Sequence, residues 1–225
     1  SSYALAQSFG HKLTPLFPSL VQLKTDTTFI KTLRGIRADC GITAVVDGRE
    51  VKKSRGDVIF TEYGISGNAV FSVSPAFAGH NGDVVISFAP EFTEEQLRDD
   101  IISKQSLGYG AGEVLALTLN NQIGRAIVKR AASSDAEIIA HTAKNFVLPV
   151  YGTLGFDYAQ VTRGGIDMND VTDELESRLC GGLFFAGEVL DIDGDCGGYN
   201  LSWAFASAER VAQAIAERTD DKADR

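Results

Sequence analysis

The residues best suited to chemistry lie in one stretch near the C-terminal end of the chain, GGLFFAGEVLDIDGDCGGYNL at Gly181–Leu201. A predicted buried strand ends at Gly187 and Glu188, and Gly197-Gly198 leads directly into a predicted helix. Glycines let a ligand approach the backbone, and the free N–H groups of a helix start bind electron-rich oxygens. A carboxylate such as Glu188 can accept hydrogen bonds from sugar hydroxyls. The pattern therefore indicates a site for a phosphorylated, ribose-like ligand.

Three acidic residues at alternate positions separate the two parts of this stretch, Asp191, Asp193 and Asp195. Their D-x-D-x-D spacing also occurs in calcium-binding loops. An EF-hand loop, however, has glycine at position 6 and glutamate at position 12, where this chain has Cys196 and Ser202. We therefore expect no metal site. Two alternatives to a ligand site stay open, an acidic loop with a structural role and a domain that binds a metal through the three aspartates.

The rest of the sequence carries none of the common catalytic motifs. It has no G-x-x-x-x-G-K-[ST], H-E-x-x-H or G-x-S-x-G motif, and no G-x-G-x-x-G turn follows a predicted strand. His11, His80 and His141 lack the spacing of metal ligands, so we expect surface or structural roles for them. The three cysteines are an odd number without a C-x-x-C pair, which favours a reducing, cytoplasmic location over a disulfide framework or a zinc site.

Composition excludes several classes of protein. The 225 residues are 44% hydrophobic and 23% charged, which is typical of a globular protein and not of a disordered chain. With 30 acidic and 21 basic residues, the formal net charge is −9. We therefore expect no nucleic-acid partner, because binding to a phosphate backbone needs clustered lysines and arginines. No uncharged apolar run reaches the roughly 18 residues of a membrane helix, so we expect no membrane association.

Periodicity and turn signals predict a β-rich segment, a helical segment and a final strand–loop–helix. Predicted strands cover 42–46, 51–53, 58–61, 84–88, 146–151, 158–162 and 183–186, with a hairpin turn at Asp47-Gly48. Predicted helices cover 3–9, 66–74, 113–120, 122–131, 134–144 and 199–217, and one more begins at Thr93.

The predicted helices have recognisable N-terminal signals. Ser66 is a plausible N-cap, and two capping boxes are expected, Thr93 with Gln96 and Ser134 with Glu137. On the helix that begins at Thr93, we expect one buried face made by Leu97, Ile101 and Ile102.

Together these elements predict a fold of the α+β or α/β class with two domains. The segment 19–150 is interpreted as an inserted domain that is β-rich and has a helical subdomain. The flanks, 1–18 and 151–225, would then form a second, incomplete domain. The chain starts abruptly with what resembles the tail of a helix, so we expect it to be a piece of a longer protein.

Several motifs extend this interpretation, namely FPSLV at 17–21, TEYGISGN at 61–68, GTLGF at 152–156, AQVTRGG at 159–165, ESRL at 176–179 and FAGEVLDIDG at 185–194, followed by GGYNL at 197–201. They resemble motifs of the bacterial BaiN-like (YhiN-like) NAD(P)/FAD-dependent oxidoreductases. The resemblance covers nearly the whole chain and is most specific over 151–208. Asn68 departs from the family pattern, in which proline is usual at this position.

The resemblance implies FAD as the cofactor. The strand end of such proteins approaches the ribityl–phosphate arm of the flavin, which implies this role for Gly187, Glu188 and Asp191. The helix start would face the pyrimidine edge of the flavin ring, where a helix N-terminus stabilises negative charge. The residues implied there are Gly197, Gly198, Tyr199, Asn200 and Leu201.

Full members of this family begin with a βαβ unit whose glycine-rich turn holds the FAD pyrophosphate, and this sequence has no such turn. The resemblance therefore implies that the flanks form an incomplete Rossmann-like FAD-binding domain and that the chain alone binds FAD poorly or not at all. The implied function is part of a cytoplasmic flavoprotein oxidoreductase, linked to NAD(P)H and acting on a small molecule. A non-catalytic interaction module, or a fragment without cofactor, remains the alternative, and the exposed flanks would favour self-association.

Overall fold

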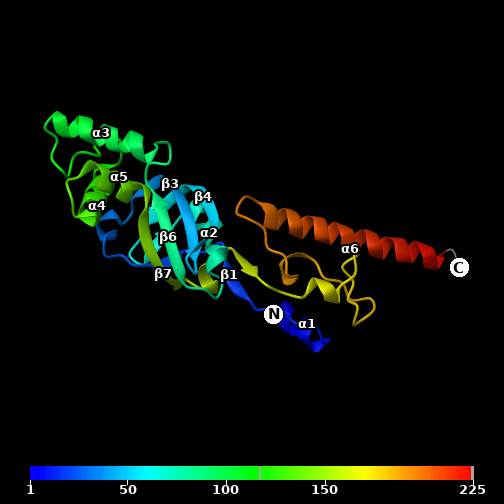
Figure 1. The fold of residues 1–225 in the computed structure, drawn as a ribbon. Coiled ribbons are helices and arrows are strands. Elements are labelled where there is room, and N and C mark those ends of the chain that lie inside the picture. Colours follow the sequence, from blue (N-terminus) through cyan, green and yellow to red (C-terminus); the bar gives the residue numbers. More distant parts are fainter. Residues whose placement is uncertain (117, 224–225) are drawn as a thin grey trace. The chain divides into compact units, whose positions relative to one another are not determined.

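The structure, a computed structural model, describes residues 1–116 and 118–223, and the chain divides into two compact units (Figure 1). One unit, here named the barrel unit, is the continuous segment Leu20–Tyr158. The other, named the discontinuous unit, combines Ser1–Ser19 with Ala159–Arg225. The borders follow Ser19 and Tyr158, whereas the sequence prediction placed them after residues 18 and 150. The fold belongs to the mixed class of helices and strands that the sequence predicts.

The barrel unit is built around a closed antiparallel barrel, of which Figure 1 labels β3, β4, β6 and β7. The strand order around the barrel is β2-β5-β4-β3-β6-β7. The ring closes where Leu23 of β2 pairs with Thr153 of β7. The strands are β2 Leu23–Thr25, β3 Arg37–Val46, β4 Arg49–Phe60, β5 Gly64–Ser66, β6 Gly82–Ser87 and β7 Phe146–Thr153.

The strands form because alternate side chains are apolar. Along β3 every second side chain points into the core, from Cys40 through Ile42 and Ala44 to Val46. Burial raises the pKa of the Cys40 thiol to about 12, so this cysteine is an unreactive core residue. The predicted turn at Asp47-Gly48 is confirmed. Both residues have a positive φ, of 51° and 73°, as a two-residue hairpin turn requires.

A short helix, α2 (Asn68–Val73), follows β5, but its N-cap differs from the prediction. Ser66 belongs to β5, and Gly67 is the N-cap with a φ of 109°. A Cβ atom on Gly67 would lie 2.2 Å from the carbonyl oxygen of Asp57, so only glycine fits there. Asn68 accepts a hydrogen bond from the N–H of Asp57 at 2.7 Å, a contact that proline could not make.

Three helices gather at one end of the barrel, with α3 (Glu94–Ser106) and α4 (Asn121–Ala131) both packed on α5 (Ala136–Lys144) (Figure 1). The predicted capping box at the start of α3 is confirmed, since the side chains of Thr93 and Gln96 each bond the other's backbone N–H. Leu97 and Ile101 are buried as expected.

Three details of this helical region differ from the sequence prediction. Ile102 is 49% exposed, because it lies about 100° around the helix from Ile101. The predicted helix 113–120 is wrong in its described residues. Residues 113–115 form turns, Ala116 makes an isolated bridge with Leu119, and residue 117 lies outside the described residues. Thr118 instead bonds Asp100 of α3 at 2.8 Å, which ties this loop to that helix. The N-cap of α5 is Asp135, not Ser134, because the charged carboxylate accepts from two N–H groups at the helix start.

The discontinuous unit has a two-stranded antiparallel sheet, in which β1 (Phe17–Ser19) pairs with β8 (Val161–Arg163). β8 begins later than the strand predicted at 158–162, because Phe156–Tyr158 forms a 3-10 turn, η3. Two helices belong to this unit, α1 (Ser2–Ser8) and the long α6 (Tyr199–Ala223), which extends beyond the predicted end at 217. Its small core contains Ala6, Ile166, Val171, Leu175, Phe185 and Leu190.

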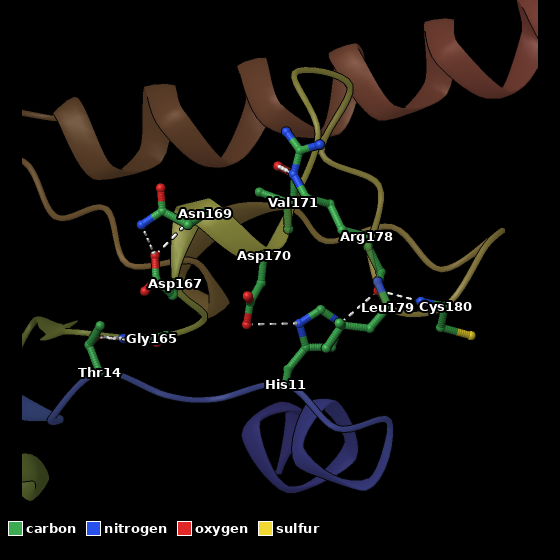
Figure 2. A network of polar contacts seen from close by, with 11 residues as sticks. His11, Thr14, Gly165, Asp167, Asn169, Asp170, Val171, Arg178, Leu179 and Cys180 are labelled. Atoms are coloured by element: carbon green, nitrogen blue, oxygen red, sulfur yellow. Dashed lines mark hydrogen bonds and ion pairs between the residues drawn. The ribbon is translucent and has the colours of Figure 1, made fainter.

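A buried histidine connects the N-terminal segment to the loops of this unit (Figure 2). The Nε2 atom of His11 lies 2.7 Å from the Oγ atom of Ser177, and the ring packs edge-on against Phe185. Ser177 Oγ already accepts the N–H groups of Leu179 and Cys180. Because both of its lone pairs are used, the hydroxyl must donate to Nε2, which places the imidazole proton on Nδ1.

The Nδ1 atom of His11 points at Asp170, whose carboxylate oxygen lies 3.8 Å away (Figure 2). The residue types are those of a Ser-His-Asp catalytic triad, but the geometry does not fit one. Ser177 is 4% exposed, and a nucleophile must reach its substrate. The cluster is therefore structural, which agrees with the role expected for His11.

Replacement of His11 should selectively destabilise the discontinuous unit. His11→Ala leaves the buried hydroxyl of Ser177 without an acceptor and opens a cavity beside Phe185, so we expect a loss of about 2 kcal/mol. The measurement is urea unfolding followed by the fluorescence of Trp203, the only tryptophan of the chain, which lies in this unit. His80→Ala, at an exposed position, is the control and should change stability by about 0.5 kcal/mol or less. Equal unfolding midpoints for the two variants would contradict the structural role assigned to His11.

Candidate functional site

The predicted strand 183–186 that leads into the candidate site is not formed. Its residues make one isolated bridge, between Phe184 and Glu176, and Phe185 donates its N–H to the carbonyl of Leu175 at 3.0 Å. A strand needs a neighbour that pairs along its length, and the segment beside it here is irregular. The expectation of a strand end at Gly187 is therefore corrected to a 3-10 turn, η5 (Gly187–Val189).

Gly187 is held against α6 through both of its backbone polar groups. Its N–H donates to Ser207 Oγ at 2.8 Å, and its carbonyl accepts from Trp203 Nε1 at 3.2 Å. The φ of Gly187 is 74°, a conformation that favours glycine, and a Cβ atom would lie 3.7 Å from that of Ala204. Trp203 and Ser207 were missed by sequence reasoning, although their spacing of four residues places both on one face of the predicted helix.

The next residue, Glu188, combines a fixed backbone with a free carboxylate. Its carbonyl accepts a hydrogen bond from the hydroxyl of Tyr3 at 3.3 Å, and its side chain is exposed. Burial raises the pKa of Tyr3, so this hydroxyl keeps its proton and remains a donor. Tyr3 is a third residue of the site that the sequence did not single out. The Glu188 carboxylate is thus placed on a fixed turn and can accept hydrogen bonds from a ligand.

The loop before α6 is closed by a reciprocal pair of hydrogen bonds. The Oδ1 atom of Asn200 accepts the N–H of Gly194 at 2.8 Å, and its Nδ2 donates to the carbonyl of Gly194 at 2.9 Å. Because the side-chain amide is used in this way, Asn200 shapes the loop and leaves its backbone N–H at the helix start. Gly197 and Gly198 complete the loop with φ of 136° and 90°.

The start of α6 presents donors and apolar side chains next to open space. The first N–H groups of a helix have no partner within it, and here they belong to the turn that follows Gly198. A Cβ atom on Gly198 would meet nothing within 4 Å, so a flat group can approach this backbone. Tyr199, Leu201 and Phe205 are 63%, 69% and 76% exposed. Leu201 and Phe205 lie four residues apart and share a face of the helix.

The three aspartates of the loop do not form a metal site in the described residues. Asp191 donates its N–H to the carbonyl of Ile166 at 3.0 Å, so its backbone is anchored. Asp193 lies 4.0 Å from Arg163 and 3.4 Å from the hydroxyl of Ser19. Within the described part of the chain, no group of three or more His, Cys, Asp or Glu residues is placed to hold a metal ion. Cys180 and Cys196 are free thiols.

The discontinuous unit also has a largely apolar hollow. It has a volume of about 260 Å³ and is lined by α1, by residues 183–186 and by Val189. Leu5 and Phe9, at its α1 side, are 59% and 45% exposed. Within the described residues, no helix is long and apolar enough to cross a membrane.

Comparison with known proteins gives consistent matches. Residues 1–214 match the family model described as HI0933-like protein Rossmann domain. A 3-dehydro-bile acid delta(4,6)-reductase of Clostridium scindens is 33% identical over 97% of this chain and 58% of its own length. A ribosomal RNA dihydrouridine synthase of Escherichia coli is 29% identical over 94% of this chain and 55% of its length. A protein of the same name from Haemophilus influenzae is 32% identical over 96% of this chain and 56% of its length.

The chain thus spans somewhat more than half the length of these three relatives. The part that matches contains all of the candidate site, since the family model extends to residue 214 and the last residue of the site is Ser207 of α6. On this match the family recognised from the sequence motifs is confirmed, and the chain belongs to the HI0933-like Rossmann-domain family.

Proposed function

We propose that this chain supplies the flavin-ring side of a FAD-dependent oxidoreductase. The observation that carries the proposal is the start of α6, where helix N–H groups and open space at Gly198 meet on one surface. A flavin needs a flat approach to the backbone and donors for its electron-rich pyrimidine edge. Because Gly198 has no side chain, a flat ring can approach the backbone there. The N–H groups at the positive end of the helix dipole are the donors for the pyrimidine edge.

The neighbouring residues fit the remainder of such a cofactor. Gly187 is fixed on α6 by two hydrogen bonds, so the exposed carboxylate of Glu188 has a defined position from which it can accept ribityl or ribose hydroxyls. Asp191, which is half-buried, is the second carboxylate on this side. Tyr199 and Leu201 would cover apolar parts of the ring system. Asn200 acts indirectly in this proposal, because it holds the loop that presents Gly198.

Bound flavin supplies hydride transfer, and the protein positions it and tunes its electronics. The names of the three relatives describe the reduction of a ring double bond, in a bile acid for one and in a uridine of ribosomal RNA for the other two. We therefore propose the same reaction class here, with NAD(P)H as the source of the hydride and a ring-containing small molecule as the substrate. A cytoplasmic location would suit this chemistry. No residue of the described site selects one substrate over another.

The isolated 225-residue chain is expected to purify without flavin. Its sequence has no G-x-G-x-x-G turn, which in dinucleotide-binding folds provides much of the anchoring of the pyrophosphate. The measurement is the visible absorbance spectrum of the purified chain, beside that of a polypeptide of the relatives' length that includes this sequence. The longer protein should show a flavin band that NADH or NADPH bleaches. A longer protein that binds no flavin would contradict the proposed function and favour a non-catalytic interaction module.

Gly198→Val in the longer protein should lower FAD affinity more than tenfold, which corresponds to at least about 1.4 kcal/mol. The valine side chain would enter the space that the proposal assigns to the ring. Gly108→Val is a matched control, because Gly108 has a φ of 89°, also has nothing within 4 Å of its virtual Cβ, and lies in the barrel unit. Both variants place valine at a position of similar positive φ and strain the backbone alike. A difference in their FAD content therefore reports on the contact between residue 198 and the flavin ring. Equal FAD loading in both variants would overturn the placement of the ring.

A further inference from the structure

A groove of the barrel unit lies between α4 and a 3-10 turn, η1 (Lys31–Leu33), and has a volume of about 420 Å³. This size is within the range of small-molecule sites. Its lining contains two cations and no acidic residue: Thr32, Gln122, Arg125, Ala126 and Lys129. The residues of the groove belong to the barrel unit, whereas those of the candidate flavin site belong to the discontinuous unit.

The sequence of α4 explains why the polar side chains face this groove. Ile123 and Ile127 are buried and fix the rotation of the helix, and Asn120 caps its first turn. Gln122, Arg125 and Lys129 are three and four residues apart, so they form one exposed row. Their positions are thus set by the packing of the opposite face of the helix.

Among the described residues, neither cation of the groove has a protein partner that would explain its position. In the part of the chain that the structure describes, neither Arg125 nor Lys129 forms an ion pair or a side-chain hydrogen bond. Their neighbour Arg130, in contrast, stacks on Phe29 with the guanidinium carbon 4.7 Å from the ring centroid. Like charges four residues apart on a helix repel each other and destabilise it. An anion bound between Arg125 and Lys129 would attract both cations and offset this repulsion.

The helix dipole accounts for only part of this arrangement. Lys129 lies in the last turn of α4, where a cation is stabilised by the helix dipole. Arg125 lies in the middle of the helix, where that stabilisation is absent. Asp26 is an acidic residue near this region, since the positive charges of Arg130 and Lys31 add to the larger effect of the Thr28 hydrogen bonds in lowering the pKa of its carboxyl group. Its carboxylate accepts hydrogen bonds from the N–H and the hydroxyl of Thr28 and forms no ion pair with Arg125 or Lys129 among the described residues.

The net charge of the chain does not exclude an anionic ligand here, because the charge is unevenly divided. The barrel unit has 14 basic and 16 acidic residues, a net charge of −2. The discontinuous unit has 7 basic and 14 acidic residues, a net charge of −7. An anion that approaches α4 therefore meets a nearly neutral unit with two unpaired cations.

We propose that this groove binds phosphate groups of a ligand between Arg125 and Lys129. The guanidinium can bind two phosphate oxygens at once, and the lysine adds a second positive charge. Gln122 and Thr32 line the groove and can each donate a further hydrogen bond. Two sources share this chemistry, a small phosphorylated molecule and the backbone of a nucleic acid.

The test uses the full chain and does not require flavin, so it is independent of the proposed oxidoreductase function. Inorganic pyrophosphate is titrated by calorimetry, and a labelled single-stranded RNA of twelve uridines is titrated by fluorescence anisotropy, both at low salt. Each probe is applied to the unaltered chain, to Arg125→Gln/Lys129→Gln and to Lys24→Gln/Arg49→Gln. The last variant removes the same charge from exposed positions of the barrel unit outside the groove.

Loss of the two groove cations should weaken the affinity for the bound probe at least tenfold, while the control variant stays within about twofold. If the probe is RNA, the slope of log K against log salt should fall by about 1.4, for two phosphate contacts. Binding of pyrophosphate alone identifies a small phosphorylated ligand, and binding of RNA alone identifies a nucleic-acid backbone. Thr32→Glu, which places a carboxylate in the groove, should also weaken binding. The proposal is overturned if neither probe binds or if the control variant loses as much affinity as the groove variant.

Discussion

The discontinuous unit has to pair its backbone N–H and C=O groups with almost no sheet. Its described strands are β1 and β8, and the long stretch between β8 and α6 is irregular. Buried backbone groups without hydrogen-bond partners destabilise the fold. Side chains therefore make the hydrogen bonds that a neighbouring strand would otherwise provide. Ser207 and Trp203 do this at Gly187, and Asn200 does it at Gly194. The geometry of the candidate site depends on these bonds, because they set where the glycines of the loop lie.

The same principle explains the role of His11 at the other side of this unit. Ser177 satisfies the N–H groups of Leu179 and Cys180, and its own hydroxyl then needs an acceptor, which is His11 (Figure 2). The hydroxyl of Ser177 thus joins its own loop to His11, so the segment before β1 and the loop after β8 hold each other. The Nδ1 atom of His11 is buried without a hydrogen-bond partner and lies 3.8 Å from the carboxylate of Asp170. A small core is sufficient here because this chain of hydrogen bonds supplements it.

Local signals predicted the structure well where the determining contacts are close in sequence. The hairpin at Asp47-Gly48 and the capping box of Thr93 and Gln96 involve residues that are neighbours in the chain, and both are present. The helix predicted at 113–120 is not formed, because the loop is tied to α3 through the distant Asp100. The strand expected at 183–186 needed a partner strand that the described chain does not provide. Apolar runs of this kind indicate a preference for burial and do not specify the neighbour.

The candidate site, too, could be predicted from the sequence only in part. The glycines and acids could be selected from their types and spacing, and their conformations follow from those types, as at Gly187 and Gly198. The residues that position them could not be selected in the same way. Trp203 and Tyr3 contact the site through their polar tips, and Tyr3 is 185 positions away from Glu188 in the sequence. Such contacts are decided by tertiary packing and carry no local pattern.

The pairing that closes the barrel has a consequence for how the chain folds. Leu23 pairs with Thr153, so the barrel cannot close until nearly all of its strands are available, and pairing across so long a separation is slow. The discontinuous unit is more delayed still, because Phe17 of β1 pairs with Arg163 of β8. During synthesis, α1 with its exposed Leu5 and Phe9 is made before the barrel unit, and the rest of the discontinuous unit is made only after it. The segment before the barrel unit therefore reaches its native environment only after the segment that follows the barrel unit has been synthesised.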